Sequence, residues 1–78
     1  MPHIAVKMLK GRTEAQKEAA AEAVKEALKK AIGCGDSHIS VTVEDYTAQD
    51  WQDVFQTEIT EKTDVLYIRP QYDPKSLL

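Results

Sequence analysis

The first two residues carry the least ordinary chemistry in this sequence of 78 residues. Met1 is followed by Pro2, and an initiator methionine is normally removed when the next residue is as small as proline. Removal would expose a secondary amine, which can act as a base in its neutral form. Most Met-Pro starts have no catalytic role, so this signal is weak by itself.

Other residue patterns that support chemistry are missing. The sequence has no glycine-rich phosphate loop, no G-x-S-x-G, no H-E-x-x-H and no C-x-x-C. His3, His38 and Cys34 could in principle bind a metal, but none of them shows metal-site spacing, and a structural or surface role is more frequent. We therefore expect no metal and no cofactor. The lone cysteine and the lack of a signal-peptide segment predict a cytoplasmic location.

The charge distribution limits the partners. A net charge of −3 counts against nucleic acid, because phosphate binding needs a basic surface. Residues 1–32 hold 7 Lys/Arg and 4 Glu, whereas residues 33–78 hold 3 Lys/Arg and 9 Asp/Glu. This asymmetry suits a small anionic ligand or complementary faces in an oligomer, and solvated helix faces would explain it equally well. No apolar run approaches the length of a membrane span.

The first half of the chain predicts a β-α-β unit. Residues 3–9 alternate apolar and polar side chains, which is typical of a strand with one buried face. Thr13 and Gln16 fit a capping box, so a helix should run from there to about Ile32 and stop at Gly33. Its predicted inner stripe is Ala20, Val24, Ala27, Leu28 and Ala31, and its predicted water-facing residues are Lys17, Glu18, Glu22, Lys25, Glu26 and Lys29.

Residues 38–46 alternate again and predict a second strand, with Ile39, Val41 and Val43 pointing inward. Two strands joined by a helix of this length should be parallel, with a right-handed crossover. A second capping signal at Thr47 predicts a short amphipathic helix. The apolar residues 65–68, which end at Arg69-Pro70, predict a third strand at an edge.

Size and element count both predict self-association. A domain of this length buries only about 60% of its unfolded surface, and the chain has neither a disulfide nor a structural metal site to add stability. One long helix covers one face of a sheet, so the other face needs the short helix or a second copy. We expect one domain over residues 1–78 that forms a homo-oligomer.

The order of these features resembles the 4-oxalocrotonate tautomerase family over most of the chain, to about residue 62. The opening Pro2-His3-Ile4 and the Gly-Arg-Thr-x-x-Gln-Lys stretch at residues 11–17 carry the resemblance, together with the second strand and the segment that begins at Trp51. The opening, the Ile39-Ser40 pair and Asp50-Trp51-Gln52 look most similar to the dimeric PptA-type subgroup. The resemblance implies a small α+β, oligomeric subunit, with a dimer favoured over a hexamer.

The resemblance also implies a mechanism without a cofactor. Pro2, once Met1 is removed, would be the general base that moves a proton between carbons of an enolised 2-oxo acid. An apolar wall and a nearby cation would lower the pKa of its amine toward neutrality. Trp51 and Phe55 could form the wall, while Arg12 could supply the cation and bind the substrate carboxylate as a planar fork.

Strand geometry places this site between subunits. Pro2 and Arg12 lie at opposite ends of a predicted strand that spans about 26 Å, so they cannot meet within one chain unless the strand bends back sharply. Antiparallel pairing of the first strands of two subunits would bring each Pro2 to the other subunit's Arg12. A monomer would then be inactive.

One position departs from the family pattern. Ser40, a candidate substrate-binding residue, stands where the prototype has a second arginine, and Arg69 or Lys7 could replace that missing charge. We therefore expect a monocarboxylate such as phenylenolpyruvate to be favoured over a dicarboxylate such as 2-hydroxymuconate. Two alternatives to a tautomerase are a dehalogenase-like or decarboxylase-like relative and a non-catalytic oligomeric binding or assembly module.

Overall fold

The computed structural model describes all residues 1–78, which form two compact units, Met1–Asp45 and Tyr46–Leu78. The first unit contains strand β1 (His3–Leu9), helix α1 (Glu14–Ile32), a short 3₁₀ helix η1 (Asp36–His38) and strand β2 (Ser40–Tyr46) except for its last residue, Tyr46. The second unit contains helix α2 (Ala48–Glu58) and the 3₁₀ helices η2 (Thr60–Val65) and η3 (Pro74–Leu77).

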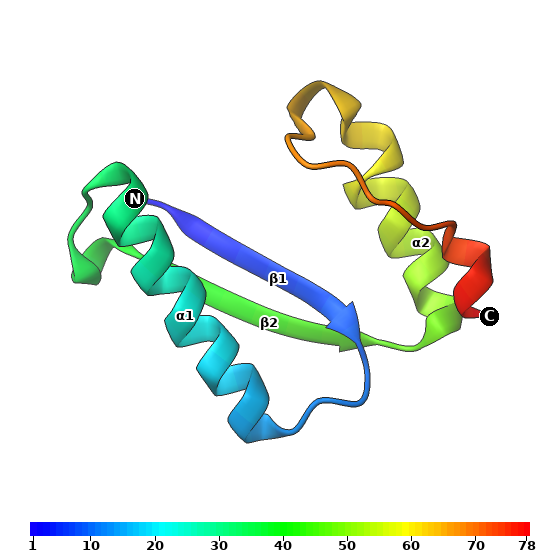
Figure 1. Ribbon diagram of the computed structural model, residues 1–78, viewed down its shortest axis with the longest axis horizontal. Coiled ribbons are helices and arrows are strands. Elements are labelled where there is room, and N and C mark those ends of the chain that lie inside the picture. Colours follow the sequence, from blue (N-terminus) through cyan, green and yellow to red (C-terminus); the bar gives the residue numbers. More distant parts are fainter. The chain divides into compact units, whose positions relative to one another are not determined.

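The predicted β-α-β unit is confirmed. β1 and β2 lie side by side as a two-stranded parallel sheet, and α1 connects them and packs along one face (Figure 1). The second strand begins at Ser40 rather than His38, because residues 36–38 form η1. Residues that alternate along β2 are half-buried and exposed in turn, as expected for a strand with one covered face.

Both predicted ends of α1 are confirmed. The Thr13 hydroxyl accepts a hydrogen bond from the Gln16 amide, and the Gln16 side chain accepts one from the Thr13 amide, which completes the capping box. At the other end, Gly33 adopts the left-handed conformation with φ 71°, and its amide donates to the Lys29 carbonyl. Glycine suits this position because a Cβ atom disfavours positive φ.

The predicted inner face of α1 is only partly correct. Ala20, Val24 and Leu28 are half-buried, but Ala27 and Ala31 are exposed. Lys17, Lys25 and Lys29, predicted to face water, are half-buried instead. Their ammonium groups reach acidic side chains outside the helix: Lys17 pairs with Asp45 at 3.0 Å, and Lys29 and Lys25 pair with Asp36 at 2.6 and 4.0 Å. The long lysine side chains can therefore cover apolar surface while their charges stay paired.

The second unit confirms the short helix and corrects the third strand. Thr47 caps α2, its hydroxyl accepting from the Asp50 amide at 3.1 Å. Residues 65–68 form no strand: Val65 ends η2, and Tyr67 and Ile68 are 96% and 87% exposed. A short apolar run becomes a strand only when another strand offers hydrogen bonds to it, and the sheet contains β1 and β2 alone.

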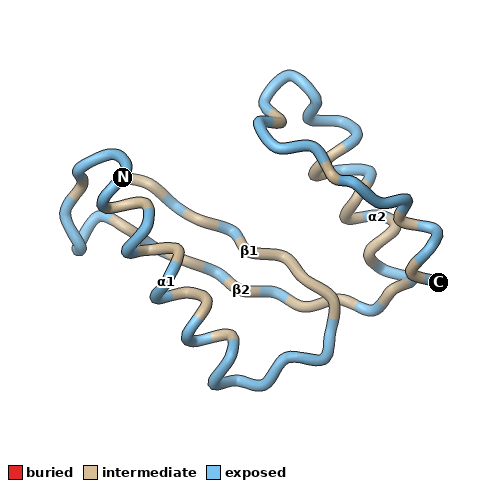
Figure 2. Tube along the Cα trace, viewed as in Figure 1, coloured by how far each residue is buried: buried red, intermediate tan, exposed pale blue.

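No residue of the chain is buried, and every position is either half-buried or exposed (Figure 2). Neither α-helix combines the length and the hydropathy that a bilayer crossing requires.

Candidate active site

Pro2 lies directly before β1 and is half-buried, whereas Met1 is 95% exposed. The Pro2 carbonyl accepts a hydrogen bond from the Ser40 amide at 3.3 Å. Because Ser40 is the first residue of β2, this bond ties the start of the chain to the beginning of the second strand. The backbone at Pro2 is therefore held in place by the sheet.

The side chains of the next residue and of Ser40 also meet. His3 Nδ1 lies 2.7 Å from Ser40 Oγ, and both residues are exposed. Val43, which lies on β2 at odd spacing from Ser40, faces α1. Because alternate residues of a strand point to opposite faces, the His3–Ser40 pair lies on the face of the sheet that α1 leaves open.

Arg12 lies beyond the other end of β1, as predicted. The seven residues of β1 separate it from Pro2, so the two residues do not meet within one chain. Arg12 is exposed, and its guanidinium makes no ion pair within the chain. It follows Gly11, whose φ of 132° is open to glycine but strained for other residues, and it directly precedes the Thr13 cap of α1.

Lys7 was one predicted replacement for the missing second arginine. Its ammonium group lies 3.2 Å from the Glu44 carboxylate, across the open face of the sheet. The charge of Lys7 is therefore already paired within its own chain. Arg69, the other predicted replacement, belongs to the second unit and is exposed.

Trp51 and Phe55 belong to a cluster of aromatic residues in the second unit. Both are half-buried, and Tyr72 contacts each of them: its hydroxyl accepts a hydrogen bond from Trp51 Nε1 at 2.9 Å, and its ring meets that of Phe55 edge-on with centroids 5.6 Å apart. Tyr46 packs against Trp51 with centroids 6.2 Å apart. We name Tyr46, Trp51, Phe55 and Tyr72 the aromatic cluster. Neither tyrosine was predicted to have a role, and the hydrogen bond from Trp51 to Tyr72 spans 21 residues, so it leaves no local signal in the sequence.

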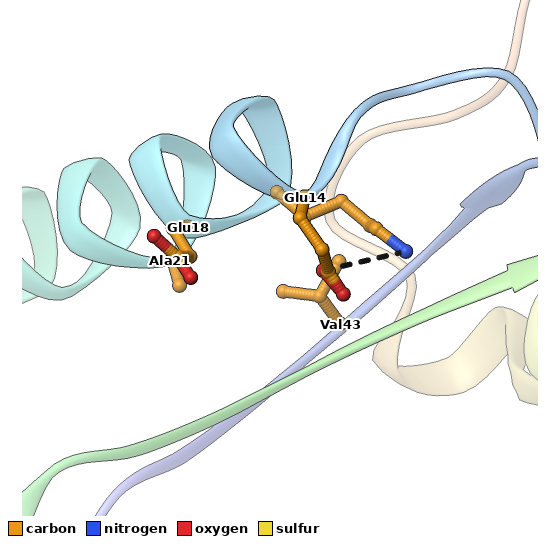
Figure 3. Close-up of a pocket in the computed structure, with 5 residues that line it drawn as sticks. Glu14, Glu18, Ala21 and Val43 are labelled. Atoms are coloured by element: carbon orange, nitrogen blue, oxygen red, sulfur yellow. Dashed lines mark ion pairs between the residues drawn. The ribbon is translucent and has the colours of Figure 1, made fainter.

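The first unit has a groove between α1 and β2, and neither Pro2 nor Arg12 lines it. Its lining is Glu14, Lys17, Glu18, Ala21 and Val43 (Figure 3). The hydrogen bond from the Lys17 ammonium to Asp45 raises the pKa of Lys17, and Glu14 is a second partner at 3.9 Å. With its lysine paired and two carboxylates at its edge, this groove does not suit an anionic substrate.

Comparison with known proteins decides the family. The family model described as "Tautomerase enzyme" matches residues 2–53. The chain belongs to the tautomerase family. It is 37% identical over 73 residues to a probable tautomerase of Xylella fastidiosa (strain 9a5c), covering 92% of this chain and 89% of the relative. The crystal structure of YwhB, described as a homologue of 4-oxalocrotonate tautomerase, matches with a TM-score of 0.58 and 40% identity over 60% of this chain and 77% of YwhB.

The match to the tautomerase family confirms the resemblance and makes the chain an enzyme, an isomerase of the tautomerase type. The matched range begins at Pro2 and includes Arg12, Ser40 and Trp51, whereas Phe55 lies beyond it. The His3–Ser40 contact was not predicted, although both residues were noted. The sequence held a partial signal for this contact, since parallel pairing of the two predicted strands brings the starts of the strands close together.

Proposed function

We propose that this tautomerase interconverts enol and keto forms of 2-oxo acids, with the Pro2 nitrogen as the general base. The observation that carries the proposal is the match to the tautomerase family from Pro2 onward, together with a Pro2 backbone that Ser40 holds at the edge of the sheet. The reaction needs the mature chain to begin at Pro2, because an amide nitrogen has no basic lone pair.

The base must be neutral at the working pH. An ordinary α-amino group titrates at about 7.7–8.0, and an apolar wall and a nearby cation both lower the pKa of an amine. We assign the wall to Trp51 and Phe55 and the cation to Arg12. The aromatic cluster supports the first assignment because Tyr72 holds both rings in place. The free guanidinium of Arg12 supports the second.

Arg12 comes from a second subunit in this proposal. The length of β1 separates it from the Pro2 of its own chain, and antiparallel pairing of two β1 strands would remove that separation. An unpaired arginine just before a helix is electrostatically unfavourable unless an anion binds there, which fits a role in binding the substrate carboxylate. The absence of any buried residue in the chain also favours a homo-oligomer, with a dimer as the simplest form.

The substrate class follows from the charges. With Ser40 in place of a second arginine and Lys7 paired with Glu44, the first unit offers one guanidinium to an acid. We therefore propose a monocarboxylate such as phenylenolpyruvate. The enzyme would act in the cytoplasm, without a cofactor.

Pro2→Gly tests the proposal. Glycine keeps methionine removal and a free amine but loses the secondary amine and the rigid ring. We expect a loss of about 100- to 10,000-fold in kcat/KM for phenylenolpyruvate ketonisation, the range of general base catalysis, with unchanged circular dichroism. Turnover that survives the substitution would contradict the role of Pro2.

A further inference from the structure

The open face of the sheet carries a histidine directly beside the proposed base. Ser40 contacts this region twice: its amide donates to the Pro2 carbonyl at 3.3 Å, and its hydroxyl lies 2.7 Å from His3 Nδ1. One residue of β2 thus fixes both the Pro2 backbone and the imidazole that follows it. Ser40 is also the position at which the family resemblance leads one to expect an arginine.

We propose that His3 Nε2 binds the carboxylate of the substrate beside Pro2, and that Ser40 is the positioning residue that orients the imidazole. This inference rests on the proposed function, because it assigns a second contact within the same site. Arg12 of another subunit would supply one contact with the acid, and His3 of the same chain as the base would supply the other.

The hydrogen bond at Nδ1 leaves Nε2 available. The imidazolium form carries a proton on both ring nitrogens, and its Nδ1–H donates to Ser40 Oγ. In the neutral tautomer whose Nδ1 accepts a hydrogen bond from the Ser40 hydroxyl, the ring proton is on Nε2. Both forms present an N–H at Nε2, and a bound carboxylate selects them over the remaining tautomer.

The position of His3 suits a 2-oxo acid. Such a substrate carries its carboxylate on the carbon next to the one that exchanges a proton, so the acid contact must lie close to the base. Consecutive Cα atoms are about 3.8 Å apart, which places the His3 backbone next to that of Pro2. Alternation along the strand would turn the Pro2 ring away from the open face, but the Pro2 nitrogen is a main-chain atom just before β1, so a substrate on the open face can still approach it.

Lys7 is the other cationic residue of β1 on this face, and two observations count against it. It is paired with Glu44 at 3.2 Å, and it lies four residues from His3, or about 13 Å along an extended strand. The single N–H of His3 replaces a bidentate arginine only in part, which agrees with a preference for one carboxylate over two.

Binding of trans-cinnamate and of its neutral isostere cinnamamide tests the assignment on the oligomeric enzyme, whether or not it turns over. We expect His3→Leu to weaken cinnamate binding by about 10- to 100-fold, the range for a hydrogen bond to a charged group, and to leave cinnamamide binding unchanged. His3→Gln, which keeps an N–H donor on a longer side chain, should recover part of that loss. Ser40→Ala should weaken cinnamate binding less than His3→Leu does, and Thr42→Ala, on the same face of β2, is the matched control that changes nothing.

The outcomes separate the two proposals. Loss of cinnamate affinity without loss of cinnamamide affinity supports His3 as the carboxylate contact, even in a preparation that shows no turnover of phenylenolpyruvate; that lack of turnover would overturn only the proposed function. Equal weakening of both ligands, unchanged cinnamate affinity in His3→Leu, or a wild-type enzyme that binds no cinnamate would overturn the assignment. Intact mass and circular dichroism confirm that each variant starts at Pro2 and is folded.

Discussion

Mixing two impaired variants tests whether the site is shared between subunits. Pro2→Gly removes the base, and Arg12→Ala removes the carboxylate contact, which should cost about 10- to 100-fold in kcat/KM. β1 has seven residues, so its ends lie about 23 Å apart, farther than an arginine side chain reaches. If each site combines Pro2 of one subunit with Arg12 of another, a hybrid oligomer contains some sites in which both residues are intact.

The expected gain follows from random assembly. In an equal mixture that is unfolded and refolded together, half of the sites receive an intact Pro2 and half of those an intact Arg12, so about a quarter of the wild-type activity should return. The assay is ketonisation of phenylenolpyruvate before and after refolding. A mixture of Pro2→Gly with the double variant Pro2→Gly/Arg12→Ala is the control and should gain nothing. Activity that stays at the level of the separate variants would refute the shared site.

Three further predictions concern the substrate, the aromatic cluster and acid stability. Assayed side by side, phenylenolpyruvate should have a higher kcat/KM than 2-hydroxymuconate, and a strong preference for the diacid would contradict the assignment of one guanidinium to the site. Trp51→Ala should raise the pKa seen in the acid limb of the kcat/KM profile, because the amine loses apolar surroundings, while Tyr67→Ala, which removes a 96% exposed ring, should leave that limb in place. Lys29 donates a hydrogen bond that holds the pKa of the Asp36 carboxyl below its usual range, so the pair stabilises the fold at neutral pH and less as the pH falls through that pKa. The free energy of unfolding in urea should change less between pH 7 and pH 3 for Asp36→Asn than for wild type. An equal change in both proteins would contradict a stabilising role of the Lys29–Asp36 pair.

Local sequence signals predicted most of the first unit. The capping box at Thr13, the stop at Gly33 and the alternation along both strands depend on neighbours a few residues away, and the structure confirms each of them. The third strand failed because strand formation depends on a partner that an apolar run cannot specify. The inner face of α1 was partly wrong for a related reason: Lys17 pairs with Asp45, which lies 28 residues away.

The candidate site, like the fold, was predicted from the sequence only in part. Residue types and family resemblance singled out Pro2, Arg12 and Trp51, and the length of β1 alone separated the first two. The contact between His3 and Ser40 and the role of Tyr72 in joining Trp51 to Phe55 depend on chain segments 37 and 21 residues apart. Such contacts follow from tertiary packing, and the structure was needed to find them.

Titration of the Pro2 nitrogen tests its proposed role as the general base. The protein would be labelled with ¹⁵N-proline, its intact mass would confirm the loss of Met1, and the nitrogen resonance would be followed with pH. We expect a free imino nitrogen with a pKa below the 7.7–8.0 or so of an ordinary α-amino group. A chain that keeps Met1, or a nitrogen that holds its proton well above neutrality, would contradict it.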